Sequence, residues 1–201
     1  MTEELKLFNR WPLSGVKVND PGLQRYISLQ SLIIPKSGGR NAQQQFHRSQ
    51  MNIVERLMNK MMVPGHRGKK HVLTSGRVVG RYFTAYKIIV TAFLKIENQT
   101  KKNPVEVLVK AIENAARREE IAAYQIGGII VRRAVITAPQ RRVDLALKDI
   151  VQASYRKSFG KKESMAGALA NEIVAAYNND KSKSDAVNER ERIERESEGA
   201  R

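Results

Sequence analysis

The sequence predicts a mainly α-helical protein: a bundle of about six helices with one protruding β-hairpin, preceded by an extended N-terminal arm. Apolar residues recur every three or four positions along most of the chain, β-branched residues gather around Gly127–Gly128, and prolines and glycines interrupt the first part of the chain. We therefore expect an arm over residues 1–48 and a helical domain over residues 49–201, with its hairpin at about 119–137.

The N-terminal arm contains many residues that disfavour helices. Pro12, Gly15, Pro21 and Gly22 lie in its first half, and its apolar residues occur singly or in short clusters. Segments of this kind bury too little apolar surface to order themselves. We expect one short helix near 23–31 and an arm that is ordered mainly by a partner.

Three helices are expected in the first half of the domain. The first stops at Pro64–Gly65, with Arg56 and Lys60 one turn apart on its flank. Its apolar residues recur at helical spacing and are Ile53, Val54, Leu57, Met58, Met61 and Met62. The second and longest helix is predicted over about 75–98, and the third begins with Pro104, which is favoured at a first helical position.

The hairpin and three further helices complete the domain. Gly-Gly between β-branched runs is typical of a two-residue hairpin turn, and the isoleucines on either side favour paired strands over a flexible loop. Apolar spacing predicts helices around 143–154 and 165–177, the latter starting after Ser164 and stopping at Asn178–Asn179. The alternating charges of 185–201 predict a solvated helix with pairs between successive turns.

The net charge is strongly positive and unevenly distributed. The chain of 201 residues carries 36 Lys and Arg against 20 Asp and Glu, a formal charge of +16. Residues 49–102 carry eleven basic and two acidic groups, so more than half of the excess lies in about a quarter of the chain. Such a concentration favours a polyanionic partner over a uniformly basic surface.

Several classes of protein are excluded or disfavoured by composition. The chain has no cysteine, which excludes disulfides, Cys-type zinc sites and thiolate nucleophiles. Its longest apolar stretch is broken by Lys87 and Lys95, so no membrane helix is expected. The N-terminus lacks the basic and apolar regions of a secretory signal, and we expect a soluble protein in the cytoplasm.

No catalytic, metal-binding or cofactor-binding pattern is present. His66 and His71 lie five positions apart in a predicted loop with no carboxylate nearby, so we expect no metal site. The stretch GHRGKK lacks both the first glycine and the final Ser or Thr of a phosphate-binding P-loop. Glu119 and Glu120 are adjacent on a strand and point to opposite faces, which does not suit paired acid–base chemistry. We therefore expect a non-enzymatic protein without a cofactor, and an enzyme acting on RNA is disfavoured.

Basic residues in pairs and small groups are the most informative feature. Each pair alone is typical of solvated surface, but together they fall at element boundaries, where loops of one side of a bundle can converge on phosphates. The predicted RNA-binding residues are Arg67, Lys69, Lys70, Arg77, Arg81, Arg117, Arg118, Arg132, Arg133, Arg141, Arg142, Arg156, Lys157, Lys161 and Lys162.

Folded RNA is favoured over DNA and over single strands. Aromatic residues make up 6% of the chain, and most of them lie on predicted apolar helix faces, which leaves few for base stacking. No short recognition helix follows a tight turn. Recognition of RNA by shape and phosphates is therefore the prediction from the residues alone.

Long motifs in the chain also resemble a known family. The stretches that carry the resemblance are VERLMNKMM, NPVEVLVKAIENAARRE, IGG, VITAPQRRVDLALKDI and SMAGALANEIVAAYNND. Over about residues 51–201 the chain resembles the universal small-subunit ribosomal protein seven family. The earlier stretches LKLFNRW and VNDPGLQRYI resemble its eukaryotic and archaeal branch, called small-subunit protein five in older eukaryotic naming.

The resemblance implies a fold, a function and contacts that agree with the residue-level reading. It implies a helical bundle with a hairpin arm that binds the three-prime major domain of small-subunit rRNA, nucleates assembly of the subunit head and lies beside other head proteins. It further implies a position near the exit-site tRNA and the messenger exit. Carried over by motif, Arg141–Arg142, Lys69–Lys70, Arg77 and Arg81 become RNA contacts, and Gly127–Gly128 becomes the hairpin tip. A free nucleic-acid-binding translational regulator remains the alternative function.

Overall fold

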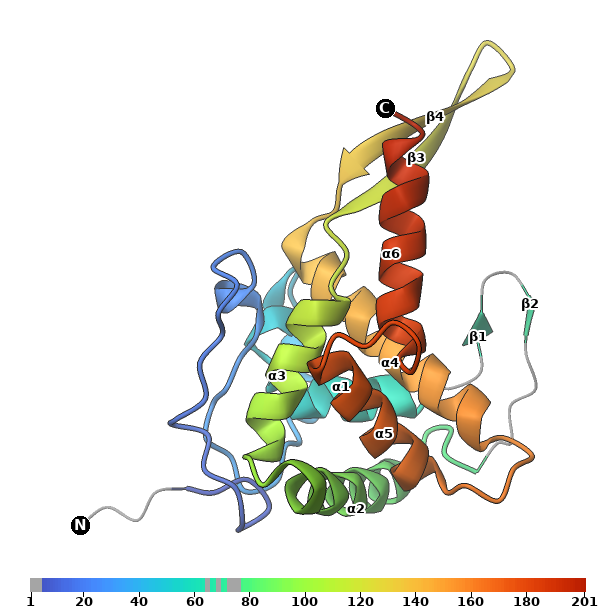
Figure 1. Cartoon of the computed structure of the whole chain (residues 1–201). Coiled ribbons are helices and arrows are strands. Elements are labelled where there is room, and N and C mark those ends of the chain that lie inside the picture. Colours follow the sequence, from blue (N-terminus) through green and yellow to red (C-terminus); the bar gives the residue numbers. More distant parts are fainter. Residues whose placement is uncertain (1–4, 64–65, 68–69, 72–76) are drawn as a thin grey trace.

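The fold of the chain is described here by a computed structural model that covers residues 5–63, 66–67, 70–71 and 77–201. Within these residues it contains six α-helices, one long hairpin and a second, very short strand pair (Figure 1). The predicted mainly helical bundle with a protruding hairpin is therefore confirmed.

The helices pack around a central helix, α5. The six helices are α1 (Ile53–Met61), α2 (Tyr82–Thr100), α3 (Pro104–Ala115), α4 (Pro139–Ser158), α5 (Met165–Tyr177) and α6 (Asp185–Glu198). Helix α5 contacts α2, α3 and α4, and its fully buried Ile173 shares one apolar core with Phe93, Ile112 and Leu147. Burial of these side chains is the main favourable term for the bundle.

The predicted starts of α3 and α5 and the predicted stop of α5 are confirmed. Asn103 accepts a hydrogen bond from the Val105 amide, and Pro104 occupies the first turn of α3. The Ser164 hydroxyl accepts a hydrogen bond from the Gly167 amide at the start of α5. Asn179, with φ of 54°, takes the left-handed conformation that ends a helix. These caps satisfy backbone groups that a helix end leaves without partners.

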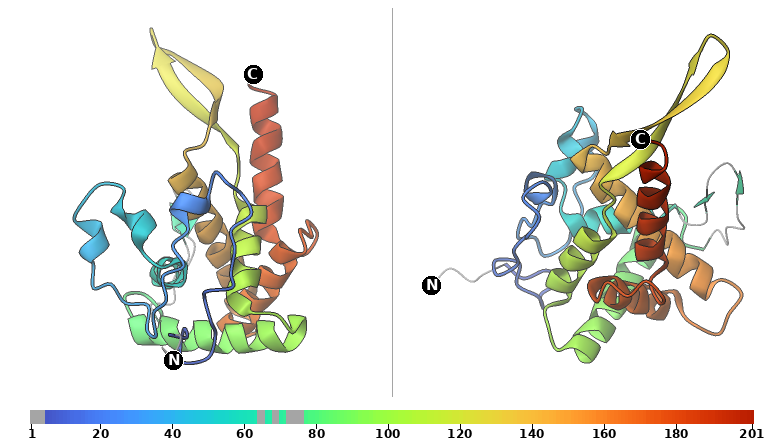
Figure 2. Two further views of the ribbon diagram at one scale, coloured as in Figure 1. Left: turned by 90° about the vertical axis from the view of Figure 1, so that its left-hand side faces the viewer. Right: turned by 45° about the horizontal axis from the view of Figure 1, so that its top comes forward.

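The hairpin consists of β3 (Glu119–Ile126) and β4 (Ile129–Ile136) and projects away from the bundle (Figures 1 and 2). Ile126 pairs with Ile129, which leaves the two glycines as the turn, with φ of 55° and 85°. Two positive φ angles are the mark of a type I′ turn and explain why glycines are needed there. The predicted hairpin and its tip are confirmed.

The C-terminal segment holds the base of this hairpin. Helix α6 packs along β3, and the Ala134 amide donates to the Ala200 carbonyl over 3.4 Å. The Arg201 guanidinium donates to the Glu119 carboxylate over 2.5 Å, and the Ser197 hydroxyl donates to the other oxygen of this carboxylate. The hairpin is therefore fixed at its base from one side and free along its outer part.

Two predictions about the region before α2 are wrong. Helix α2 begins at Tyr82 and not near residue 75, because Gly80 takes a φ of 67° that a right-handed helix does not accommodate. Arg77 and Arg81 therefore lie in the turn before the helix and not on its first turn. Where a loop was predicted, β1 (His66–Arg67) pairs antiparallel with β2 (Lys70–His71).

The arm contains single helical turns in place of the predicted helix near 23–31. These are the 3₁₀ turns η1 (Gln24–Tyr26), η2 (Arg40–Ala42) and η3 (His47–Gln50). After η1 the chain becomes extended, because Ser28 forms a parallel bridge with Asn52, which caps α1.

The arm is also seated on the bundle, whereas a partner was predicted to order it. Trp11 packs edge-on against Phe93 with ring centroids 5.5 Å apart, and its indole Nε1 donates to Glu97 over 3.1 Å. Leu7 and Leu23 are fully buried in the same core. Sequence analysis missed this packing because the isolated apolar residues of the arm find their partners far along the chain. The division of the chain into an arm and a domain at residue 48 stays a prediction.

Candidate nucleic-acid interface

Several elements that carry predicted RNA-binding residues project from the bundle. In Figure 1 the hairpin rises from the top of the bundle and leans to the right, and strands β1 and β2 and the loop between α4 and α5 lie at its right-hand side. In Figure 1 the turn that leads into α2 lies there as well. That these elements converge on one RNA surface stays a prediction.

We call five exposed cations on these elements the cationic side: Arg81, Arg132, Arg133, Lys161 and Lys162. None of the five forms an ion pair with another residue in the part of the chain that the structure describes. Their charge is thus available to an external anion. Arginine presents a planar fork that matches two phosphate oxygens, and lysine presents a compact charge.

The two hairpin arginines point to opposite faces of the ribbon. Arg132 pairs with Ala123, and Arg133 pairs with Ala122. Because directly paired residues share a face and successive residues alternate, each face carries one guanidinium opposite a small alanine. The methyl group leaves the guanidinium accessible, so the hairpin can contact anions from both sides.

The other predicted residues near the start of α2 are placed only in part. Strand pairing sets Arg67 opposite Lys70, whereas Lys69 lies outside the described residues. Arg77 is exposed in the turn before α2.

A second group of predicted residues is held by internal carboxylates. Arg117 is buried and pairs with Asp149. Arg142 donates to Asp20 over 2.9 Å and to the Arg117 carbonyl over 3.2 Å, which ties α4 to the arm and to the end of α3. Burial raises the pKa of Asp149, and the attraction of Arg117 opposes this rise.

Three more predicted residues form ion pairs, two of them at the surface and one with a buried carboxylate. Arg141 donates through Nε and a terminal nitrogen to the two oxygens of Glu120, over 2.7 and 2.9 Å. This two-point hydrogen bond raises the pKa of Arg141. Arg156 pairs with Asp185, and Lys157 pairs with the buried carboxylate of Glu172.

Arg118 is neither among the five residues of the cationic side nor among the residues that pair with a carboxylate through their side chains. Its side chain is exposed, while its backbone amide donates to Glu194 of α6 over 2.8 Å. Its carbonyl accepts from the Thr137 amide, which closes the base of the hairpin. The residue is thus fixed by its backbone and leaves its guanidinium at the surface.

Arg56, which was predicted on the flank of the first helix, is buried. Its side chain is 1% exposed and donates to the Tyr26 carbonyl over 2.6 Å and to Asp144 over 3.4 Å. Asp144 also lies 3.7 Å from Arg48 and 3.8 Å from Lys60. Burial lowers the pKa of Arg56, and Asp144 opposes this effect. No local signal reveals the pair, because Asp144 follows Arg56 by 88 positions.

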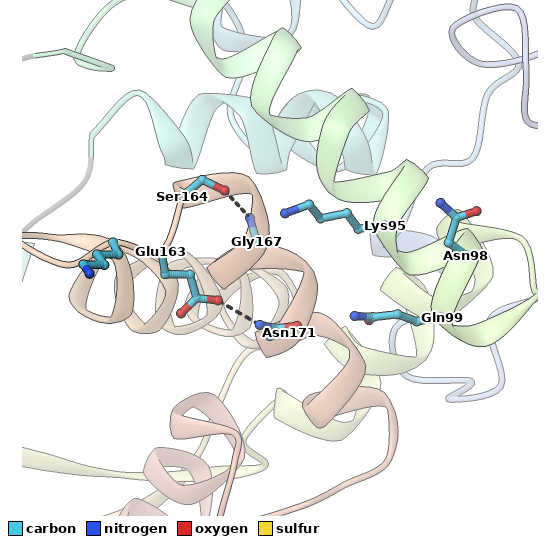
Figure 3. A pocket seen from close by; sticks show the side chains of 8 residues that line it. Lys95, Asn98, Gln99, Glu163, Ser164, Gly167 and Asn171 are labelled. Atoms are coloured by element: carbon cyan, nitrogen blue, oxygen red, sulfur yellow. Dashed lines mark hydrogen bonds between the residues drawn. The ribbon is translucent and has the colours of Figure 1, made fainter.

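A polar cavity of about 640 Å³ lies where α2 meets the start of α5 (Figure 3). Its lining residues are Lys95, Asn98, Gln99, Lys162, Glu163, Ser164, Gly167 and Asn171. Lys95 extends toward Gly167, where a β-carbon would lie 3.1 Å from its Nζ atom. The Glu163 carboxylate accepts from the Asn171 amide over 2.8 Å. Because Lys162 lines this cavity together with Lys95 of α2, the cavity extends the cationic side toward α2. Sequence analysis did not identify this extension.

In the ranges that the structure describes, no helix has the length and apolar character needed to cross a bilayer. A helical body that presents accessible cations on a projecting hairpin and on the loops between its helices is typical of a protein that binds a structured polyanion.

The family model for ribosomal protein S7p/S5e matches residues 23–201, and the chain belongs to this family of ribosomal proteins. The family resemblance inferred from the motifs is therefore confirmed.

Curated relatives agree over nearly the full length. The chain is 46% identical to small ribosomal subunit protein uS7 of Nanoarchaeum equitans over 198 residues, which cover 98% of this chain and 100% of the relative. It is 44% identical to the protein of the same name from Archaeoglobus fulgidus, covering 99% of this chain and 96% of that one. The corresponding protein of Methanococcoides burtonii is 43% identical, with coverage of 98% and 99%.

Proposed function

We propose that this chain is a structural component of the small ribosomal subunit that binds rRNA through its cationic side. The single observation that carries the proposal is that the hairpin, the loop between α4 and α5 and the turn before α2 present exposed cations that form no ion pair within the described residues, in a chain that belongs to a ribosomal protein family. Phosphate neutralisation by such groups supplies affinity, and their fixed positions on a packed bundle supply selectivity for one RNA shape.

The finer proposal concerns the place of the chain on the subunit. We infer that it binds the three-prime major domain of the rRNA, nucleates head assembly beside other head proteins, and lies near the exit-site tRNA and the messenger exit. The projecting hairpin supports this proposal, since an arm fixed only at its base can reach beyond the RNA that the bundle itself contacts.

The predicted contact residues are proposed to act in two ways. Arg81, Arg132, Arg133, Lys161 and Lys162 bind phosphates directly, together with Arg118, because their charges are accessible. The internally paired residues hold in place the helices and loops that present the accessible cations. Such a residue gives up its carboxylate partner for an RNA phosphate only where the phosphate replaces the lost ion pair. Those paired residues are Arg117, Arg141, Arg142, Arg156 and Lys157.

Salt-dependent binding to a small-subunit rRNA fragment that spans the three-prime major domain tests the proposal. Each lost phosphate contact lowers the magnitude of the negative slope of log K against log salt by about 0.7–0.9, so binding becomes less sensitive to salt. The double variants R132A/R133A and K161A/K162A should each lower this magnitude by about 1.4–1.8. The control R192A removes an exposed arginine that Glu189 and Glu196 already neutralise, and it should leave the slope near the wild-type value. Equal slopes in all variants would contradict the proposal.

The alternative function, a free translational regulator, makes a different prediction in the cell. A structural component co-sediments with the small subunit and remains there in moderate salt, whereas a regulator is found mainly outside that fraction. Quantitative detection of the chain across a sucrose gradient separates the two functions.

A further inference from the structure

Phe46 occupies a backbone position and an environment that do not suit phenylalanine. Its φ is 67° and its ψ is −7°, in the left-handed region that glycine and asparagine adopt far more readily than a bulky residue. Its side chain is 67% exposed, so it buries little apolar surface. Among the described residues its ring stacks on no other aromatic ring and lies under no cation. Within the described part of the chain, neither ring stacking nor a cation–π contact therefore compensates for the strain.

The loop that carries Phe46 is held firmly at both ends. At its start, the Ser37 amide and hydroxyl both donate to the buried Glu55 carboxylate, over 2.8 and 2.7 Å. At its end, Asn52 caps α1 and donates to the Gln30 carbonyl over 2.8 Å. The left-hand panel of Figure 2 shows the intervening segment projecting from the bundle.

The conformation of Phe46 itself is fixed by the turn that follows. Its carbonyl accepts from the Ser49 hydroxyl over 2.9 Å and from the Ser49 amide over 3.2 Å. The ring is thus presented to solvent on a fixed backbone, which lowers the entropy lost when a ligand stacks on it.

The charge around this ring favours RNA as the ligand. Residues 21–54 contain no acidic residue, while Arg40 lies six positions before Phe46 and Arg48 two positions after it. Arg48 is 56% exposed and shares Asp144 with Arg56 and Lys60, so that one carboxylate faces three cations. Three glutamines, 43–45, directly precede it and offer amide groups for base edges and phosphates. Stacking on an exposed aromatic ring is the usual way in which proteins hold an unpaired base.

We propose that Phe46 is a stacking site for an unpaired base of the bound RNA. The proposal rests on the proposed rRNA-binding function and assigns to the loop at 38–50 a contact that recognises a base and not the phosphate backbone alone. Phe46 lies outside the cationic side as defined above, so it adds a separate point of attachment.

The test compares Phe46→Ala, Phe46→Leu, Phe46→Trp and Phe46→Gly in binding to the same small-subunit rRNA fragment. Loss of one stacked base lowers affinity by about 5- to 150-fold, and we expect this for the alanine and glycine variants. Leucine keeps apolar bulk without a π-face and should lose most of the affinity, whereas tryptophan should retain it. The slope of log K against log salt should stay at the wild-type value in all four, because no phosphate contact is removed.

Phe46→Gly gives a second readout that separates binding from folding. Glycine relieves the backbone strain, so the melting temperature of the free protein should rise while RNA affinity falls. If the wild type binds the fragment and Phe46→Ala binds within twofold of it, the stacking site is refuted, and Phe46 then serves a protein neighbour or none. If the wild type itself fails to bind the fragment, the proposed rRNA-binding function fails instead.

Discussion

Replacing Asp144 by alanine should destabilise the fold strongly, because it leaves the guanidinium of Arg56 buried without a counter-charge. Of the three cations around Asp144, Arg48 and Lys60 are 56% and 33% exposed, so their pairs are screened by water and contribute little. Arg56 is 1% exposed and, of its contacts with the described residues, would keep the hydrogen bond to the Tyr26 carbonyl. Removing one partner of a buried pair costs about 3–5 kcal/mol.

Urea denaturation of the free protein measures this cost directly, and a thermal melt gives an independent estimate. For a domain of this size each kcal/mol lowers the melting temperature by about 2–4 °C, so a loss of about 6–20 °C is expected. Asp185→Ala is the matched control, since it removes a carboxylate from the half-exposed Arg156 and should cost about 0–1 kcal/mol. A cost below about 1 kcal/mol for Asp144→Ala would refute the assignment of Arg56 as a buried, carboxylate-dependent charge.

Two further predictions concern the hairpin. The hydrogen bond from Arg201 lowers the pKa of Glu119, so this contact stabilises the fold above the ordinary glutamate pKa of about 4.3 and is lost as the pH falls through the lowered pKa. Arg201→Ala should therefore move the titration of the Glu119 carboxyl group to higher pH, which NMR can follow. An unchanged titration would disprove the contact. Gly128→Val places a β-branched residue at a φ of 85° and should weaken the hairpin by about 1–2 kcal/mol. Amide exchange should accelerate at Ile126 and Ile129 but not at Ile173 in α5, whereas uniform acceleration would show that hairpin and bundle unfold together.

Much of the fold could be predicted because its signals are local. The spacing of apolar residues in α3 and α5, Pro104 at the start of α3, the cap Ser164 and the glycine pair of the hairpin each specify structure within a few residues. The start of α2 was missed because apolar spacing continues through Val79, and the left-handed backbone of Gly80 cannot be read from that spacing.

The candidate site was predictable in composition but not in pairing. Sequence identifies Arg117 and Arg142 as basic residues near element ends, yet their carboxylate partners lie 32 and 122 positions away. Periodicity likewise places Arg56 beside an apolar helix face without revealing that the arm covers it. Which cations remain accessible is decided by tertiary contacts, so the cationic side emerges only from the folded chain.

The internal carboxylates have a consequence for how the protein discriminates among polyanions. A loosely fitting polymer that approaches Arg142 or Arg141 finds each guanidinium occupied, by Asp20 or by Glu120. Displacing these carboxylates is favourable only for a ligand that offers several phosphates in matching positions at once, because each isolated exchange gains little. The attraction felt by an arbitrary nucleic acid is therefore much weaker than the 36 Lys and Arg residues alone would suggest, and off-target association is suppressed by the protein's own acidic side chains.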